Sequence, residues 1–143
     1  MTPLSPYILS IVIAWLVAQS AKLLIDSVKK QGAIDVRQLY KSGSMPSSHS
    51  AAAVALVTII GLTGGSNTES FAIATLFAAI VMYDSVMVRR SSGEQGIAIG
   101  SLIKEQKSNI RIPRTAKGHE PLEVAVGALI GLAVGLFVFF LTQ

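Results

Sequence analysis

The sequence has no cysteine and few charged residues. Without cysteine, neither a disulfide framework nor a thiolate metal site can form. Only 14% of the 143 residues are charged, whereas ordinary soluble chains carry about 25%. In contrast, 51% of the residues are hydrophobic and the mean hydropathy is +0.59. Because this length corresponds to about one domain, we expect residues 1–143 to form a single polytopic membrane domain.

Charge is nearly absent from four apolar stretches, each close to the ~20 residues that cross a bilayer as a helix. These stretches predict helices near residues 5–25, 47–65, 69–88 and 121–141. The first lacks a basic n-region and a cleavage site, so we expect it to be a retained span. The predicted fold is all-α, an integral membrane four-helix bundle. A long loop at 89–118 separates the third and fourth helices, and Ile97 to Ile103 within it predict a short helix on the membrane surface.

One face of the predicted bundle has no lysine or arginine. All twelve basic residues lie in the 26–46 and 89–118 connections or at the helix ends that meet them. Short basic connections stay in the cytoplasm, so we expect a protein of the cell's inner membrane with both termini outside. Membrane lipids are the expected surroundings, and nucleic acid is not an expected partner.

Polar side chains gather at the predicted cytoplasmic helix ends, among them the only two histidines of the chain. These residues are Gln19 and Lys22 on the first helix, Ser47, Ser48 and His49 on the second, Asp84, Arg89 and Arg90 on the third, and His119 and Glu123 on the fourth. The convergence of the two histidines is the main functional prediction. It favours a site at the cytoplasmic face.

The motif MPSSHS at 45–50 predicts the start of a helix, with Ser47 or Ser48 as its cap. The free N–H groups of a first helical turn, together with the helix dipole, form an anion site that suits phosphate. A serine-capped helix with a surface histidine remains the alternative.

The motif GHEPLE at 118–123 places His119 four residues before Glu123. On a helical turn this spacing brings the two side chains to one face. Glu123 would then hold one ring nitrogen and leave the other free for attack, as in an oriented nucleophile. A simple ion pair at a helix start is the alternative.

The stretch 83–96 contains Asp84, Arg89 and Arg90. Paired guanidinium groups clamp phosphate oxygens well, although the two arginines also fit residues that snorkel to the interface. An ionisable residue inside a span usually has an internal partner, and for Asp84 we expect Lys22 or an arginine. Gln19 and Lys22 lie one turn apart and are expected to face the same cavity.

Together, MPSSHS at 45–50, D-x4-RR-x2-G-x-Q at 84–95 and GH-x-PLEV at 118–124 resemble the divergent branch of the type 2 phosphatidic acid phosphatase family, which is related to acid phosphatases and vanadium-dependent haloperoxidases. The resemblance implies phosphomonoester hydrolysis through a phosphohistidine, without a metal or cofactor. It implies His49 as the general acid, His119 as the nucleophile and Glu123 as the residue that orients it. The phosphate-binding residues are then expected to be Ser47, Ser48, Lys41, Arg89 and Arg90, with Asp84, Lys22 and Gln19 in support.

The expected function is therefore that of a membrane-embedded phosphatase for a phosphorylated lipid: phosphatidylglycerophosphate, phosphatidic acid or a prenyl phosphate. Two alternatives remain, a non-catalytic protein that binds anionic lipid and a small transporter. Gly127, Gly131 and Gly135 recur at four-residue spacing, which lets helices approach closely. This stripe favours packing within the bundle, or else a face for a homo-oligomer.

Overall fold

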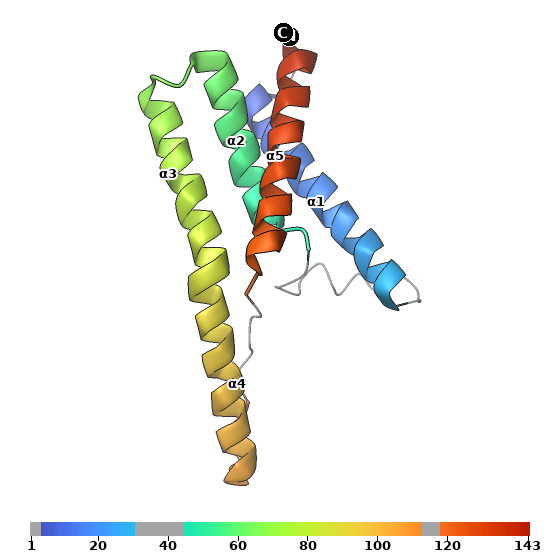
Figure 1. Cartoon of the computed structure of the whole chain (residues 1–143), viewed down its shortest axis with the longest axis vertical. Coiled ribbons are helices and arrows are strands. Elements are labelled where there is room, and N and C mark those ends of the chain that lie inside the picture. The colour runs from blue at the N-terminus through green and yellow to red at the C-terminus, as the bar shows by residue number, and fades with distance from the viewer. Residues whose placement is uncertain (1–3, 31–44, 113–117) are drawn as a thin grey trace.

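The computed structural model describes residues 4–30, 45–112 and 118–143 (Figure 1). All regular structure in these ranges is helical. The elements are α1 (Pro6–Lys30), α2 (Ser48–Gly64), α3 (Glu69–Tyr83), a π-helix η2 (Asp84–Val88), α4 (Arg89–Glu105) and α5 (Pro121–Thr142). The all-α prediction is confirmed for these ranges, and the four predicted spans correspond to α1, α2, α3 with η2, and α5.

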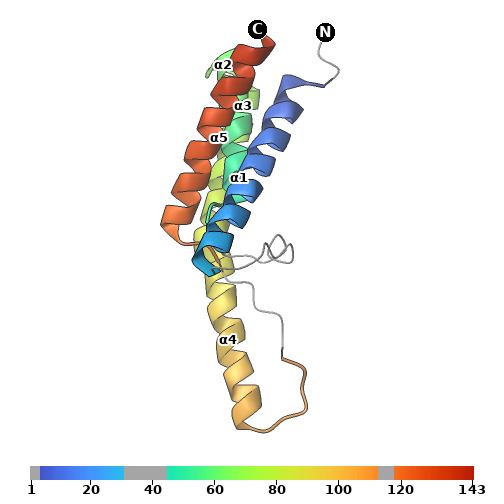
Figure 2. The same cartoon turned by 90° about the vertical axis from the view of Figure 1, so that its right-hand side faces the viewer.

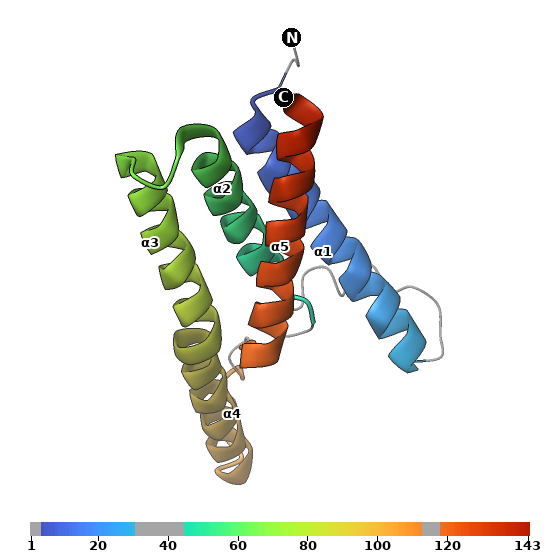
Figure 3. The same ribbon diagram turned by 45° about the horizontal axis from the view of Figure 1, so that its top comes forward.

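Helix α2 lies at the centre of the apolar helices. It contacts α1, α3 and α5, and α1 also contacts α5. Figures 1 and 3 show α3 on the opposite side of α2 from α1, so the helices surround α2 instead of closing into a ring. The N-terminal end of α1 and the C-terminal end of α5 lie at the same end of the molecule as the turn from α2 to α3. The predicted four-helix bundle is not confirmed by this arrangement, in which α1, α3 and α5 each contact α2.

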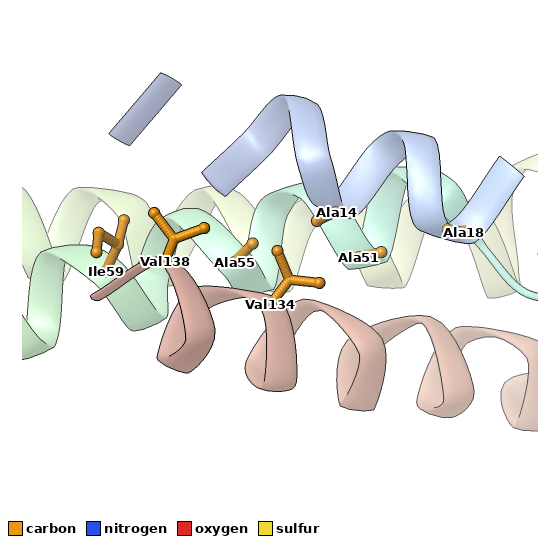
Figure 4. Packing of buried hydrophobic residues seen from close by; sticks show 7 residues of the cluster. All are labelled: Ala14, Ala18, Ala51, Ala55, Ile59, Val134 and Val138. Atoms are coloured by element: carbon orange, nitrogen blue, oxygen red, sulfur yellow. The ribbon is translucent and has the colours of Figure 1, made fainter. Parts of the chain in front are cut away.

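Small residues bring α1, α2 and α5 close together. The core consists of Ala14, Ala18, Ala51, Ala55, Ile59, Val134 and Val138 (Figure 4). On α5, a Cβ atom added to Gly127 would collide with the carbonyl oxygen of Ser47, and one added to Gly131 with that of Ala51. The glycine stripe thus packs against α2 within the chain, as the first of the two interpretations predicted. Within one chain α2 covers these glycines, and a homo-oligomer through this face stays a prediction.

Large apolar side chains cover the outside of the helices. Ile73 is 69% exposed and Phe140 is 75% exposed, which is favourable against lipid and costly in water. Within the described ranges, three helical segments are long and apolar enough to cross a membrane: Pro6–Val28, Glu69–Glu105 and Pro121–Thr142. Helix α2 is also apolar but has 17 residues, or about 26 Å against a hydrocarbon core of about 30 Å.

Helices α3, η2 and α4 form one continuous rod (Figures 1 and 2). Its 37 residues span about 55 Å at the α-helical rise, so α4 extends well beyond the other helices. Figure 2 shows residues 106–112 turning back alongside α4. The prediction of a loop at 89–118 is wrong for residues 89–105, which form α4. The short surface helix predicted within that loop is instead part of the rod. The polar residues after Val88 mark the end of an apolar span, but polarity does not end a helix, and no proline interrupts residues 84–105.

Candidate functional site

The beginning of α2, the junction of η2 with α4 and the beginning of α5 meet at the end of the bundle away from the termini (Figure 1). Two backbone hydrogen bonds join them. The N–H of Ser47 donates to the carbonyl of Glu123 over 3.1 Å, and the N–H of His119 donates to the carbonyl of Ser85 over 3.0 Å. Three segments that are distant in the sequence therefore form one framework around the histidines.

Glu123 orients His119, as the four-residue spacing predicted. The Nδ1 atom of His119 lies 2.8 Å from Oε2 of Glu123, and the His119 side chain is only 8% exposed. The same Oε2 accepts the backbone N–H of Glu120 over 3.2 Å as part of a capping box that begins α5. Because an ionised carboxylate only accepts hydrogen bonds, Nδ1 is the nitrogen that carries the proton in the neutral ring, and Nε2 then keeps its lone pair. Among the described residues, Nε2 has no hydrogen-bond partner.

Ser47 is the N-cap of α2. Its hydroxyl accepts hydrogen bonds from the N–H of Ser50 over 3.4 Å and from the hydroxyl of Ser50 over 2.9 Å. The side chain is fully buried, and its N–H is bonded to Glu123. The cap therefore holds the start of α2, and the binding of phosphate by Ser47 stays a prediction. The N–H groups of the first turn of a helix have no partner within the helix, and in this turn the side chain of His49 is exposed.

Charged side chains from other helices act on His49. The positively charged Arg89 and Lys22, the negatively charged Asp84 and the ring of His119 all lie within electrostatic range of it. Lys22, which is 5% exposed, also interacts with the charges of Asp26 and Glu123. The two histidines thus lie at the same end of the bundle and within electrostatic range of each other.

The two arginines differ in their surroundings. Arg89 forms an ion pair with Asp84 over 2.6 Å, so the partner predicted for this aspartate is an arginine. Arg90 pairs with Glu94 over 3.3 Å and is not among the charges that act on His49. Instead, Arg90 borders a pocket of about 190 Å³ whose remaining lining residues are Gly93, Glu94, Ile97, Gly118, His119 and Glu120. The charge of Arg89 therefore acts on His49, whereas Arg90 lines a pocket that His119 also lines.

Sequence reasoning missed Ser85 and Gly118, and it gave Glu120 no role. A Cβ atom at Gly118 would collide with the backbone of Arg90, so this glycine allows the chain before His119 to lie against α4. Nothing in the sequence marks Ser85, because its role depends on a π-helical turn. Lys41, which we predicted as a phosphate-binding residue, lies outside the described residues. No cluster of three or more potential metal ligands occurs in the part of the chain that the structure describes.

Gln19 is 9% exposed, and its Oε1 has no hydrogen-bond donor among the described residues. It lies one helical turn from Lys22 on the buried side of α1. An unsatisfied buried polar atom costs about 1–3 kcal/mol, so Gln19→Met, which keeps the side-chain length, is expected to raise the stability of the detergent-solubilised protein by about 1 kcal/mol or more. Thermal unfolding followed by circular dichroism measures this. Gln95→Met is the matched control, because Gln95 is exposed on α4, and it is expected to leave stability unchanged. A Gln19→Met variant less stable than wild type would show that Oε1 has a partner.

The helices are apolar, and both histidines lie at one end of the bundle. These features define a membrane protein with a polar site at that end. The chain belongs to the divergent PAP2 family, whose model matches residues 5–134. It is 33% identical over 144 residues, 90% of either chain, to a protein of Bacillus subtilis (strain 168) named "Uncharacterized membrane protein YuiD". No solved structure matches the chain. The resemblance stated from the three motifs is thereby confirmed, and membership in a PAP2-type family suggests a membrane protein related to phosphatases.

Proposed function

We propose that the protein is a membrane-embedded phosphatase that hydrolyses the phosphomonoester of a lipid through a phosphohistidine. The observation that carries the proposal is the buried imidazole of His119, held by Glu123 at 2.8 Å with Nε2 unbonded among the described residues, at the same end of the bundle as the exposed His49. A buried, oriented base beside a second, accessible imidazole is an arrangement suited to nucleophilic and acid–base catalysis.

In the first step, Nε2 of His119 attacks the phosphorus atom and the bond from phosphorus to the lipid alkoxide breaks. The protonated ring of His49 transfers a proton to the departing oxygen, which leaves as an alcohol. Glu123 accepts the Nδ1 hydrogen bond and thereby stabilises the positive charge that the His119 ring gains. The products of this step are the dephosphorylated lipid and a phosphohistidine.

In the second step, water attacks the phosphorus atom of the phosphohistidine. His49, now neutral, takes a proton from this water, and the bond from phosphorus to Nε2 breaks. Inorganic phosphate leaves and both histidines return to their initial states. Positioning and electrostatic stabilisation provide most of the catalysis in phosphoryl transfer, which fits a site made of side chains that other residues hold in place.

The phosphate oxygens are proposed to bind Ser48, the first N–H groups of α2 and the side chains of Arg89 and Lys22. Arg89 and Lys22 are the basic residues whose charges act on His49. Arg90 and Lys41 remain proposed phosphate-binding residues, with Arg90 acting from the pocket beside His119. Asp84 holds Arg89 at 2.6 Å, so it is proposed to orient this guanidinium group.

The substrate is proposed to be a lipid whose tails stay in the bilayer: phosphatidylglycerophosphate, phosphatidic acid or a prenyl phosphate. Lysine and arginine are concentrated at the end of the bundle that carries the site and are absent from the other end. This distribution supports a cytoplasmic site in the inner membrane, with both termini on the outer side. On this orientation, α4 projects into the cytoplasm and the tails of the lipid lie against the apolar outer surfaces of the helices.

The proposal is tested by incubating the purified protein in mixed micelles with each of these three lipids and measuring released phosphate. A ³²P-labelled substrate is expected to leave an acid-labile, base-stable label on the protein, as a phosphohistidine does. Activity that persists after exhaustive chelation is expected from the metal-free chemistry. Binding of the lipids with no release of phosphate, and no loss of binding when both histidines are replaced, would instead favour the non-catalytic lipid-binding protein.

A further inference from the structure

We propose that the π-helical turn η2 positions His119 for catalysis. This inference rests on the function proposed above, because positioning is defined by the reaction of Nε2. The turn comprises Asp84–Val88 and lies in the middle of the rod from α3 to α4. Turns of this type are rare and are frequent at functional sites. In this chain, η2 contacts both α4 and α5.

The π-turn frees a backbone carbonyl that His119 uses. In a regular α-helix the carbonyl of Ser85 would accept the N–H of Arg89, four residues later. In η2 this N–H donates to the carbonyl of Asp84, five residues earlier. The Ser85 carbonyl, which has lost its usual donor, accepts the N–H of His119 over 3.0 Å. The hydrogen bond that fixes the backbone of His119 therefore depends on the extra residue in the turn.

Neighbouring contacts fix the same geometry. Ser85 is 2% exposed and its hydroxyl donates to the carbonyl of Val81 over 2.9 Å. The ion pair of Asp84 with Arg89 joins residues five apart, a spacing that matches the π-turn. Gly118 lies against the backbone of Arg90 so closely that a Cβ atom would be 2.7 Å from the Cβ of Arg90. The backbone of residues 118–119 is thus held by η2 and α4, while Glu123 on α5 holds the ring.

Removal of one residue from η2 is expected to undo this arrangement. If Met87 is deleted, Arg89 follows Asp84 by four positions, and the N–H of Arg90 becomes the α-helical donor to Ser85. The carbonyl is then occupied, and α4 turns by about 100° relative to α3, which carries Arg90 away from Gly118. Because small displacements of reacting groups are costly, kcat is expected to fall by about tenfold or more, and KM is expected to rise because Arg89 turns with α4. Deletion of Ala98, an exposed residue of α4 beyond these contacts, is the matched control and is expected to keep both constants close to wild type.

A second readout does not depend on activity. The chain has two histidines, so ¹⁵N labelling of histidine gives two sets of ring signals, which His49→Asn assigns. In the wild type, His119 is expected to show a single tautomer with the proton on Nδ1. The Met87 deletion is expected to show averaged ring signals for His119, and the Ala98 deletion the wild-type pattern. If the wild type releases no phosphate, the proposed function fails, and the ring signals alone decide whether η2 positions His119.

Gly118→Ala tests the same inference without a deletion. The added methyl group would meet the backbone of Arg90, whereas the one in the control Gly64→Ala would meet only Thr68 Cγ2 at 3.9 Å. Gly118→Ala is expected to average the His119 ring signals and lower kcat, and Gly64→Ala to do neither. Wild-type ring signals and kcat in both the Met87 deletion and Gly118→Ala would overturn the inference.

Discussion

The His119→Asn variant is expected to release no measurable phosphate and to acquire no covalent label. Asparagine keeps a nitrogen close to the position of Nδ1, so the hydrogen bond to Glu123 and the start of α5 are expected to persist. It has no atom in the place of Nε2. Because the nucleophile of a covalent mechanism cannot be replaced by its neighbours, the loss in kcat is expected to be at least about a thousandfold. Phosphate release and ³²P incorporation are measured on the same samples.

His49→Asn distinguishes the nucleophile from the acid. Without His49, neither the leaving alkoxide nor the attacking water has its proton carrier. With an aryl phosphate, whose leaving group needs little protonation, the first step is expected to proceed and the second to be slow. The phosphohistidine should then accumulate in His49→Asn and be absent in His119→Asn.

Tyr7→Phe serves as the general control. Tyr7 pairs with Thr63 over 3.1 Å at the other end of the bundle, so this variant is expected to behave as the wild type in both assays. Full turnover in His119→Asn would refute the role assigned to this residue. Incorporation of ³²P into the same variant would refute it as well.

The convergence of the two histidines could be predicted because it follows from simple rules. Four apolar stretches alternate in direction across a bilayer, which places the starts of α2 and α5 at the same end. The four-residue spacing of His119 and Glu123 then brings the two side chains together once Pro121 begins a helix. For these residues the local pattern and the final structure agree.

The contacts of the backbone could not be predicted in this way. Ser85 binds His119 only because a π-turn releases its carbonyl, and no residue type in DSVMV favours that turn over an α-helix. The same holds for the extension of the rod, since the residues of α4 are as compatible with a surface helix as with a continuation of α3. Gly118 approaches Arg90, and Ile112 approaches Gly100. A sequence pattern does not contain these tertiary contacts.

The second large effect is expected from Gly131→Ala, a substitution that adds one methyl group in the middle of α5. Helix propensity alone would favour alanine by about 1 kcal/mol. At this position, however, the new Cβ would collide with the carbonyl oxygen of Ala51 and lie 3.0 Å from the N–H nitrogen of Ala55. Backbone atoms of α2 cannot rotate away as a side chain can, so the two helices must separate. We expect the free energy of unfolding to fall by about 3 kcal/mol, measured by denaturation in mixed micelles with Trp15 fluorescence as the probe.

Gly64→Ala is the control for Gly131→Ala, because it adds the same methyl group near the end of α2, where the nearest other atom is 3.9 Å away. This variant is expected to be as stable as the wild type or slightly more stable. The loss of stability expected for Gly131→Ala affects the site as well as the fold. When α5 moves away from α2, the hydrogen bond from Ser47 to Glu123 lengthens, and His119 moves relative to His49. Gly131→Ala is therefore expected to lose phosphatase activity under conditions in which it remains helical, and equal stability of the two variants would mean that α2 and α5 are not packed through this glycine.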